Sequence, residues 1–195
     1  TVTLTATSST ICSGGSTTLI ASGASTYSWM PGSLTGTSVI VYPGSTTTYT
    51  VTGTAVTGCT DTQTVTVTVN ANPTVAVAPA TICRGFCATL TASGANTYTW
   101  APATALSATT GASVNACPTV TTTYTVTGTA LTGCTDTQTV TVTVNVSATL
   151  TISMTPVLCN GGSTGTATVV ATGGNAPYTY LWTPSAQTNA TATGL

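Results

Sequence analysis

Few residues of this chain have side chains that could do chemistry: seven cysteines, two aspartates, one arginine and three tryptophans among 195 residues. Asp61 and Asp136 each follow Gly-Cys-Thr and stand alone in the sequence, so the carboxylate pairs needed for acid–base catalysis or calcium binding are missing. We expect both aspartates to cap turns at hairpins rather than to act catalytically or bind metal. Arg84, beside Phe86, could be a contact point, but we expect it to be a loop residue.

The cysteines predict disulfide bonds formed in an oxidising compartment, because seven in a small chain are typical of secreted domains. They do not predict zinc, since the chain has no histidine and the Cys83-x3-Cys87 pair has no matching pair in the other repeats. No cofactor is expected.

Internal repetition organises the chain. Residues 49–70 and 124–145 are identical except that Val56 is replaced by Leu131. Further matches place the cysteines and tryptophans of one copy in register with those of the other. Near-identical neighbours of this kind are typical of an array made by duplication.

The offset between the copies gives their boundaries. It is 71 residues in the front half and 75 in the back half, so the second copy carries four extra residues between Trp100 and Cys117, which predicts a longer loop. We predict a first repeat at 1–70, a second repeat at 71–145 and a third unit at 146–195. The third unit lacks a counterpart of the closing cysteine and of the last strand, and we expect it to be incomplete at its C-terminus.

Four cysteines recur in the two repeats. Cys12 and Cys83 fall just before the predicted second strand, whereas Cys59 and Cys134 fall near the start of the last strand. We predict a staple at one end of each sandwich, with pairs Cys12–Cys59 and Cys83–Cys134. Closing a loop of this length stabilises the fold by about 4 kcal/mol on the chain-entropy model.

The remaining cysteines have no equivalents in the first repeat. Cys87 and Cys117 align with Ser16 and Tyr42, so we predict that they pair with each other as an added staple. Cys159 of the third unit has no partner in this chain, and we expect its partner to lie beyond Leu195.

Strand patterns supply the elements that must position these residues. Thr64 to Val69 alternates threonine with valine, which predicts a strand with valines toward a core and threonines toward solvent. About seven such short segments per repeat, separated by Gly, Pro, Asn and Ser clusters, are typical of a β-sandwich. We predict an all-β fold of tandem immunoglobulin-like antiparallel β-sandwich repeats stapled by disulfides. No segment has a helical period.

Aromatic residues on alternating strands are predicted to fill the cores. The predicted core aromatics are Trp29, Trp100, Trp182, Tyr49 and Tyr124. The alternative for the tryptophans is stacking on sugar rings at the surface, as in carbohydrate-binding modules.

Composition excludes several classes of function. Charged residues are 2% of the chain, against roughly a quarter in ordinary proteins. One arginine cannot neutralise a phosphate backbone, so nucleic acid is not an expected partner. No apolar run approaches the ~18 residues of a membrane span. No signal peptide opens the sequence, so the export signal is expected to lie elsewhere or to have been removed.

The low content of charged residues also affects whether the chain associates with other copies of itself. Edge strands are usually guarded by lysine, proline or inward-pointing charges, and this chain has almost no charge to guard with. Self-association of threonine-rich edges into a fibre or array is therefore a hypothesis.

The third unit resembles a known family. Its sequence runs Cys159-Asn-Gly-Gly-Ser-Thr-Gly-Thr-Ala-Thr-Val, then Gly173-Gly174-Asn-Ala-Pro177-Tyr-Thr-Tyr-Leu-Trp182. This resembles the front half of the SprB-type repeat of gliding-motility adhesins and other surface proteins of the Bacteroidetes. The first two repeats resemble the immunoglobulin-like and PKD-like repeats found beside it. The resemblance implies export to the cell surface, through the type IX route, and display as an adhesin or filament.

We therefore expect a non-catalytic structural or adhesive segment of a secreted, cell-surface or filament protein. Its expected partners are other copies of itself and surface glycans. The alternative is a glycan-binding accessory module of a secreted polysaccharide-degrading enzyme, which an exposed aromatic platform would support. A third possibility is a filament subunit whose last domain is completed by strands of the next subunit.

Overall fold

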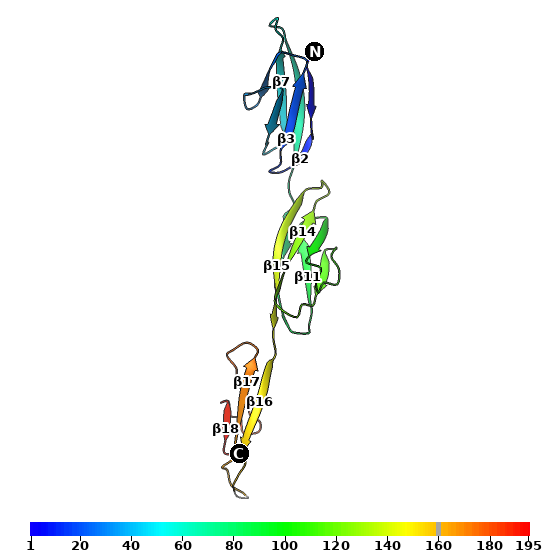
Figure 1. The fold of residues 1–195 in the computed structure, drawn as a ribbon. Coiled ribbons are helices and arrows are strands. Elements are labelled where there is room, and N and C mark those ends of the chain that lie inside the picture. Colours follow the sequence, from blue (N-terminus) through cyan, green and yellow to red (C-terminus); the bar gives the residue numbers. More distant parts are fainter. Residues whose placement is uncertain (159–160) are drawn as a thin grey trace. The chain divides into compact units, whose positions relative to one another are not determined.

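A computed structural model of the chain describes residues 1–158 and 161–195, all of them in strands or connecting loops (Figure 1). These residues divide into two compact units. The first comprises Thr1–Ala76, Ser93–Tyr98 and Thr127–Thr137, and the second comprises Val77–Ala92, Thr99–Val126 and Gln138–Leu195. The predicted all-β fold class is confirmed. The boundaries of the three repeats, 1–70, 71–145 and 146–195, stay a prediction.

The first repeat is a sandwich of two sheets, with strand orders β1-β3-β6 and β2-β8-β7-β4-β5. Its strands are β1 (Thr3–Ala6), β2 (Thr10–Cys12), β3 (Thr17–Ser22), β4 (Thr26–Met30), β5 (Leu34–Thr35), β6 (Ser38–Val41), β7 (Thr47–Thr54) and β8 (Thr60–Asn70). Side chains from both sheets form one core. Its fully buried members are Leu19, Trp29, Val51 and Val67.

Alternation explains how β8 contributes to this core. Val67 is fully buried and its neighbours Thr66 and Thr68 are exposed, because successive side chains of a strand point to opposite faces. The exposed threonines pair across strands. Thr48 and Thr66, for example, are joined by a hydrogen bond of 2.9 Å between their hydroxyls.

One strand pair departs from the predicted antiparallel arrangement. β2 runs parallel to β8, with Ile11 opposite Val69 and Cys12 opposite Asn70. The pairs β1–β3, β3–β6, β4–β5, β4–β7 and β7–β8 are all antiparallel. The parallel pair places Cys12 beside the end of β8, not its beginning.

The second repeat has the same kind of sheets, with orders β10-β15-β14-β12 and β13-β11-β9. Its strands are β9 (Ala76–Val77), β10 (Ala80–Cys83), β11 (Ala88–Ser93), β12 (Thr97–Ala101), β13 (Ser113–Ala116), β14 (Thr122–Thr129) and β15 (Thr135–Asn145). β10 again pairs in parallel with the last strand, with Cys83 opposite Asn145. The extra residues form a loop after β12 that carries isolated bridges at Thr99–Thr110 and Leu106–Ala116.

The third unit forms one described sheet, of order β16-β17-β18. Its strands are β16 (Ala148–Thr155), β17 (Thr166–Gly173) and β18 (Thr191–Thr193). Ala167, Val169 and Ala192 are buried in it.

Candidate functional site

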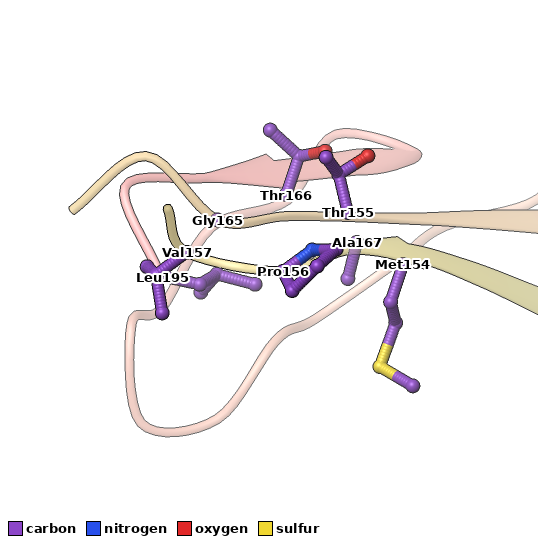
Figure 2. Close-up of a pocket in the computed structure, with 8 residues that line it drawn as sticks. All are labelled: Met154, Thr155, Pro156, Val157, Gly165, Thr166, Ala167 and Leu195. Atoms are coloured by element: carbon purple, nitrogen blue, oxygen red, sulfur yellow. The ribbon is translucent and has the colours of Figure 1, made fainter. Parts of the chain in front are cut away.

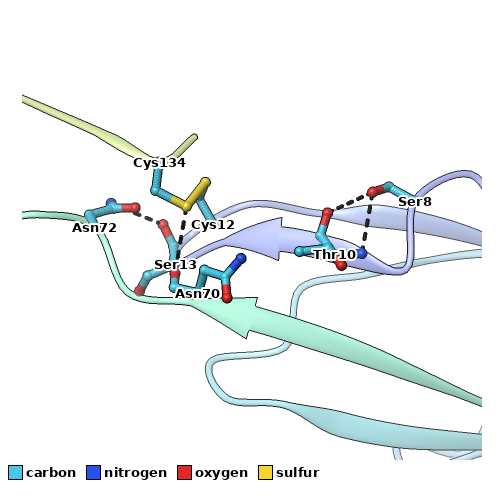
Figure 3. The surroundings of a disulfide bond; sticks show 7 residues. All are labelled: Ser8, Thr10, Cys12, Ser13, Asn70, Asn72 and Cys134. Atoms are coloured by element: carbon cyan, nitrogen blue, oxygen red, sulfur yellow. Dashed lines mark hydrogen bonds between the residues drawn. A yellow bond between two sulfur atoms is a disulfide. The ribbon is translucent and has the colours of Figure 1, made fainter. Parts of the chain in front are cut away.

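A disulfide joins the first repeat to the second. The Sγ atoms of Cys12 and Cys134 are 2.06 Å apart and their Cα atoms 5.6 Å apart, across 122 residues of sequence (Figure 3). Cys12 ends β2, and Cys134 lies in the turn between β14 and β15. Both cysteines belong to the first compact unit, which takes in that turn.

Two hydrogen bonds hold Ser13, the residue after Cys12, in place. Ser13 N donates to the Asn70 carbonyl over 2.8 Å, and the Asn72 side-chain amide donates to the Ser13 carbonyl over 3.3 Å (Figure 3). Cys134 Sγ lies 4.0 Å from the Asn70 oxygen, and Cys134 is only 1% exposed. The Cys134 half of the disulfide is therefore enclosed, whereas Cys12 is half-buried.

This pairing corrects the predicted pairs Cys12–Cys59 and Cys83–Cys134. Cys12 lies opposite Asn70, the last residue of β8, whereas Cys59 immediately precedes the first residue of that strand. At about 3.3 Å per residue, the eleven positions between them span roughly 36 Å, far beyond disulfide reach. The parallel pairing of β10 with β15 separates Cys83 from Cys134 in the same way.

Cys87 and Cys117 form the second disulfide, which is the pairing that the alignment predicted. Their Sγ atoms are 2.02 Å apart. Ala88 pairs with Ala116 in the β11–β13 ladder, so Cys87 and Cys117 are the next residues outward on the two strands. Ser16 and Tyr42 flank the equivalent pair Thr17–Val41 of the first repeat.

Two other cysteines are free in the described part of the chain, Cys59 and Cys83, and both are exposed. The seventh, Cys159, for which a partner beyond Leu195 was predicted, lies outside the described residues.

Each of the two aspartates, in the last strand of its repeat, binds the residue just before the first strand. Val2 N donates to Asp61 Oδ2 over 2.7 Å, and Val75 N donates to Asp136 Oδ2 over 2.9 Å. The hydrogen bond from Val2 is the main cause that lowers the pKa of Asp61, with a smaller contribution from Thr62 N. Each aspartate, expected to cap a turn, instead forms a clamp between two segments that are distant in sequence.

The other candidate residues have structural positions. Arg84 is exposed in the turn after β10, and its backbone N donates to the Asn145 carbonyl over 2.8 Å. No group of three His, Cys, Asp or Glu side chains that could hold a metal ion occurs within residues 1–158 and 161–195. The same residues include no helix long and apolar enough to cross a membrane.

Four of the five predicted core aromatics are buried: Trp29, Trp100, Tyr49 and Tyr124. Burial raises the pKa of both tyrosines. The indole N–H of each of these tryptophans donates over 2.9 Å to a carbonyl, of Gly36 or of Gly111.

Trp182 differs, because it is only half-buried. Its indole N–H donates to the Asn189 carbonyl over 2.8 Å. One edge of the side chain lines an open hollow of about 250 Å³, shared with Tyr180, Leu181 and Val169 and with Leu150 and Ile152 of β16.

β16 carries an uncovered apolar stripe, which we call the β16 face: Leu150, Ile152 and Met154. Leu150 and Ile152 are each 59% exposed and Met154 is 78% exposed. These alternate residues share one side of the strand, while threonine and serine occupy the other. The alternation is readable in the sequence, but nothing there indicates that the face is left uncovered.

A second hollow, of about 470 Å³, continues from the β16 face beyond Met154. Figure 2 shows Val157 and Leu195 next to each other at one end of it, Pro156 between, and Met154 toward the other end. Its walls are mostly apolar, so the third unit offers hydrophobic surface along the length of β16.

Comparison with family models gives a match in the third unit. Residues 151–187 match the family model described as the SprB repeat. A search of the curated proteins finds no match.

Solved structures give only distant likenesses. The insect immune protein hemolin is 13% identical with a TM-score of 0.37, covering 70% of this chain and 44% of its own. A Ca²⁺-stabilised adhesin with which an Antarctic bacterium binds ice is 19% identical with a TM-score of 0.40, covering 89% and 58%. The chain thus spans less than two thirds of either structure, and at these TM-scores the likeness carries no argument. The resemblance of the third unit to the SprB repeat, predicted from its sequence, is confirmed over residues 151–187.

Proposed function

We propose that this chain is a structural and adhesive repeat segment of a cell-surface or extracellular protein, without catalytic activity. The SprB match in the third unit supports this function, and so does the near-identity of the two repeats before it. The two disulfides support an oxidising location outside the cytoplasm.

The β16 face is the observation that carries the adhesive part of the proposal. In the first repeat, the three-stranded sheet β1-β3-β6 is covered by the other sheet, and Leu19 and Ala21 of β3 are buried against it. In the third unit, Leu150, Ile152 and Met154 remain exposed. Burying one such side chain contributes about 1.5–3 kcal/mol, so the face favours association with apolar surface.

The occupant that fits this face is a second β-layer of the kind that β7 and β8 form in the first repeat. There, Val51 and Val67 present alternating apolar side chains to the opposite sheet and are fully buried. We propose that a further copy of such a repeat supplies this layer, which makes the third unit a point of self-association.

Sedimentation velocity over a range of concentrations tests this function. The wild-type chain is expected to associate as its concentration rises, whereas the double variant Leu150→Thr/Ile152→Thr stays monomeric. The matched control is Val56→Thr/Leu131→Thr, which removes two apolar side chains that are 93% and 89% exposed in hairpin turns, and it should associate like the wild type. A wild-type chain that remains monomeric at every concentration would contradict self-association.

The glycan-binding alternative has one observation in its favour, the open hollow beside Tyr180 and Trp182. Titration with soluble polysaccharides, followed by tryptophan fluorescence, separates the two functions. The proposal predicts no saturable change. A saturable shift that disappears in Trp182→Phe would favour the accessory module instead.

A further inference from the structure

The two free cysteines occupy the positions that form the inter-repeat disulfide. Cys83 ends β10 opposite Asn145, as Cys12 ends β2 opposite Asn70. Arg84 N donates to the Asn145 carbonyl over 2.8 Å, as Ser13 N does to Asn70. Cys83 therefore has the same strand register, and the same hydrogen bond at the next residue, as the bonded Cys12.

Cys59 is likewise presented as Cys134 is. The Cys59 carbonyl accepts from Ala55 N over 2.8 Å, and the Cys134 carbonyl accepts from Ala130 N over the same distance. A glycine at φ near +85° precedes each cysteine, with 86° at Gly58 and 84° at Gly133. The two turns have the same shape, but only Cys134 forms a disulfide.

The two turn cysteines differ in how far they are exposed to solvent. Cys134 is 1% exposed because its surroundings include Cys12 and Asn70 of the first repeat, whereas Cys59 is exposed. Cys59 instead lines an open hollow of about 330 Å³ whose other walls include Val2, Ala24 and Asp61. This end of the first repeat thus keeps uncovered the surface around its turn cysteine.

We propose that Cys59 and Cys83 are disulfide sites for further repeats of the same type. Cys59 bonds to the Thr-Ile-Cys cysteine of a further repeat. Cys83 bonds to the Gly-Cys-Thr-Asp cysteine of a repeat in another copy of the chain, because the third unit that follows it here has no such cysteine. Each of these bonds would reproduce the Cys12–Cys134 bond that joins the first repeat to the second. This inference does not depend on the adhesive role.

The bond requires an oxidant, and a disulfide such as oxidised glutathione serves. One thiolate attacks glutathione disulfide, forming a mixed disulfide and releasing one reduced glutathione. The second thiolate then displaces the other glutathione. Two protein thiols lose two electrons and two protons in all, and one glutathione disulfide becomes two reduced glutathione molecules.

The decisive test extends the full chain by one repeat. Residues 1–73 placed ahead of Thr1 recreate the natural junction, because Pro73-Thr1-Val2 then reproduces Pro73-Thr74-Val75. After equilibration in a glutathione buffer, Cys59 of the original chain is expected to lose its reactivity toward maleimide. Peptide mapping without reduction should find it bonded to Cys12 of the added repeat.

Two controls in the extended chain make the result specific. Cys59→Ser in the original chain should leave Cys12 of the added repeat reactive. Cys59→Ser/Ser45→Cys, which moves the thiol to another exposed position of the same repeat, should not restore the bond. The new bond should need the same concentration of reduced glutathione for half-reduction as Cys12–Cys134, within about threefold.

A second arm identifies where the partner repeat comes from. The unextended chain is kept in the same buffer as a mixture of ¹⁵N-labelled and unlabelled protein. Mixed-isotope Cys59–Cys83 peptides would support bonding between separate copies, and a bond in the extended chain alone would support bonding along one polypeptide. A Cys59 that stays a thiol or a glutathione adduct in both arms would overturn the proposal.

Discussion

Which cysteines pair in this chain depends on the direction of the strands, and the alternation of apolar and polar residues does not encode that direction. The Cys87–Cys117 pair could be predicted because alignment with Ser16 and Tyr42 places both residues at one end of an antiparallel ladder. The predicted staples within each repeat were wrong because β2 lies parallel to β8. A period of two residues is the same in parallel and antiparallel strands, so no sequence pattern gave the direction.

A single proteolytic cut distinguishes the two sets of pairs. Arg84 is the only basic residue, so trypsin cuts the chain once, in an exposed turn. In Cys83→Ser the two fragments should stay joined on a non-reducing gel, because Cys12–Cys134 bridges the cut. In Cys12→Ser they should separate. The opposite pattern would restore the pair Cys83–Cys134.

Asp61 should make the first repeat sensitive to acid. Its pKa is lowered in the folded state, chiefly by the hydrogen bond from Val2 N, so the carboxylate stabilises the fold above its unfolded value of 3.8. This contribution is lost as the pH falls through the lower, folded pKa. The thermal midpoint of Asp61→Asn should therefore change less than that of the wild type between pH 7 and about pH 2, measured by circular dichroism. Equal changes in the two thermal midpoints would show that the charge of Asp61 does not contribute to stability.

At the scale of the elements, the strands were predictable and their closest contacts were not. Threonine–valine alternation predicted β8 and the burial of Val67. It did not predict that β7 approaches the N-terminal segment so closely at Gly53. A Cβ added at Gly53 would lie 2.8 Å from Ala24 Cβ and would also collide with Val2. Burial depends on such partners from distant segments, which is also why the predicted core residue Trp182 is only half-buried.

Gly53→Ala should therefore destabilise the first repeat, because the added methyl group would overpack the core beside Val2 and Ala24. The expected loss is about 1–3 kcal/mol in the free energy of unfolding, measured by urea denaturation. Gly44→Ala is the matched control, since a Cβ there meets nothing within 4 Å. A loss at Gly53 no larger than at Gly44 would mean that the segment at Val2 moves aside.

Across the whole molecule, hydroxyl groups take the place that charges have on most protein surfaces. Threonine makes up more than a quarter of the chain and charged residues only 2%. This property could be predicted entirely from composition, because it does not depend on how the strands pair. The third unit's match to the SprB repeat was equally visible in its sequence.

Stability and self-association should consequently be nearly independent of salt. Salt screens interactions between exposed charges, and this chain has three charged side chains. Between 50 mM and 1 M sodium chloride, the thermal midpoint at pH 7 should shift by no more than about 2 °C. Calorimetry at the two concentrations measures this directly. A larger shift would point to a charge interaction that the chain's composition does not suggest.

The bond between Cys12 and Cys134 also decides how the chain would respond to tension. A pull applied to its two ends passes from Cys12 straight to Cys134, so the 122-residue stretch that the bond closes carries no load. Reducing that one bond would release a slack of roughly 300 Å once the stretch unfolded, because Cys87–Cys117 keeps 30 of its residues closed. The redox state of the surroundings would then set how far a tethered chain can extend, because the bond limits the extension of this stretch until it is reduced.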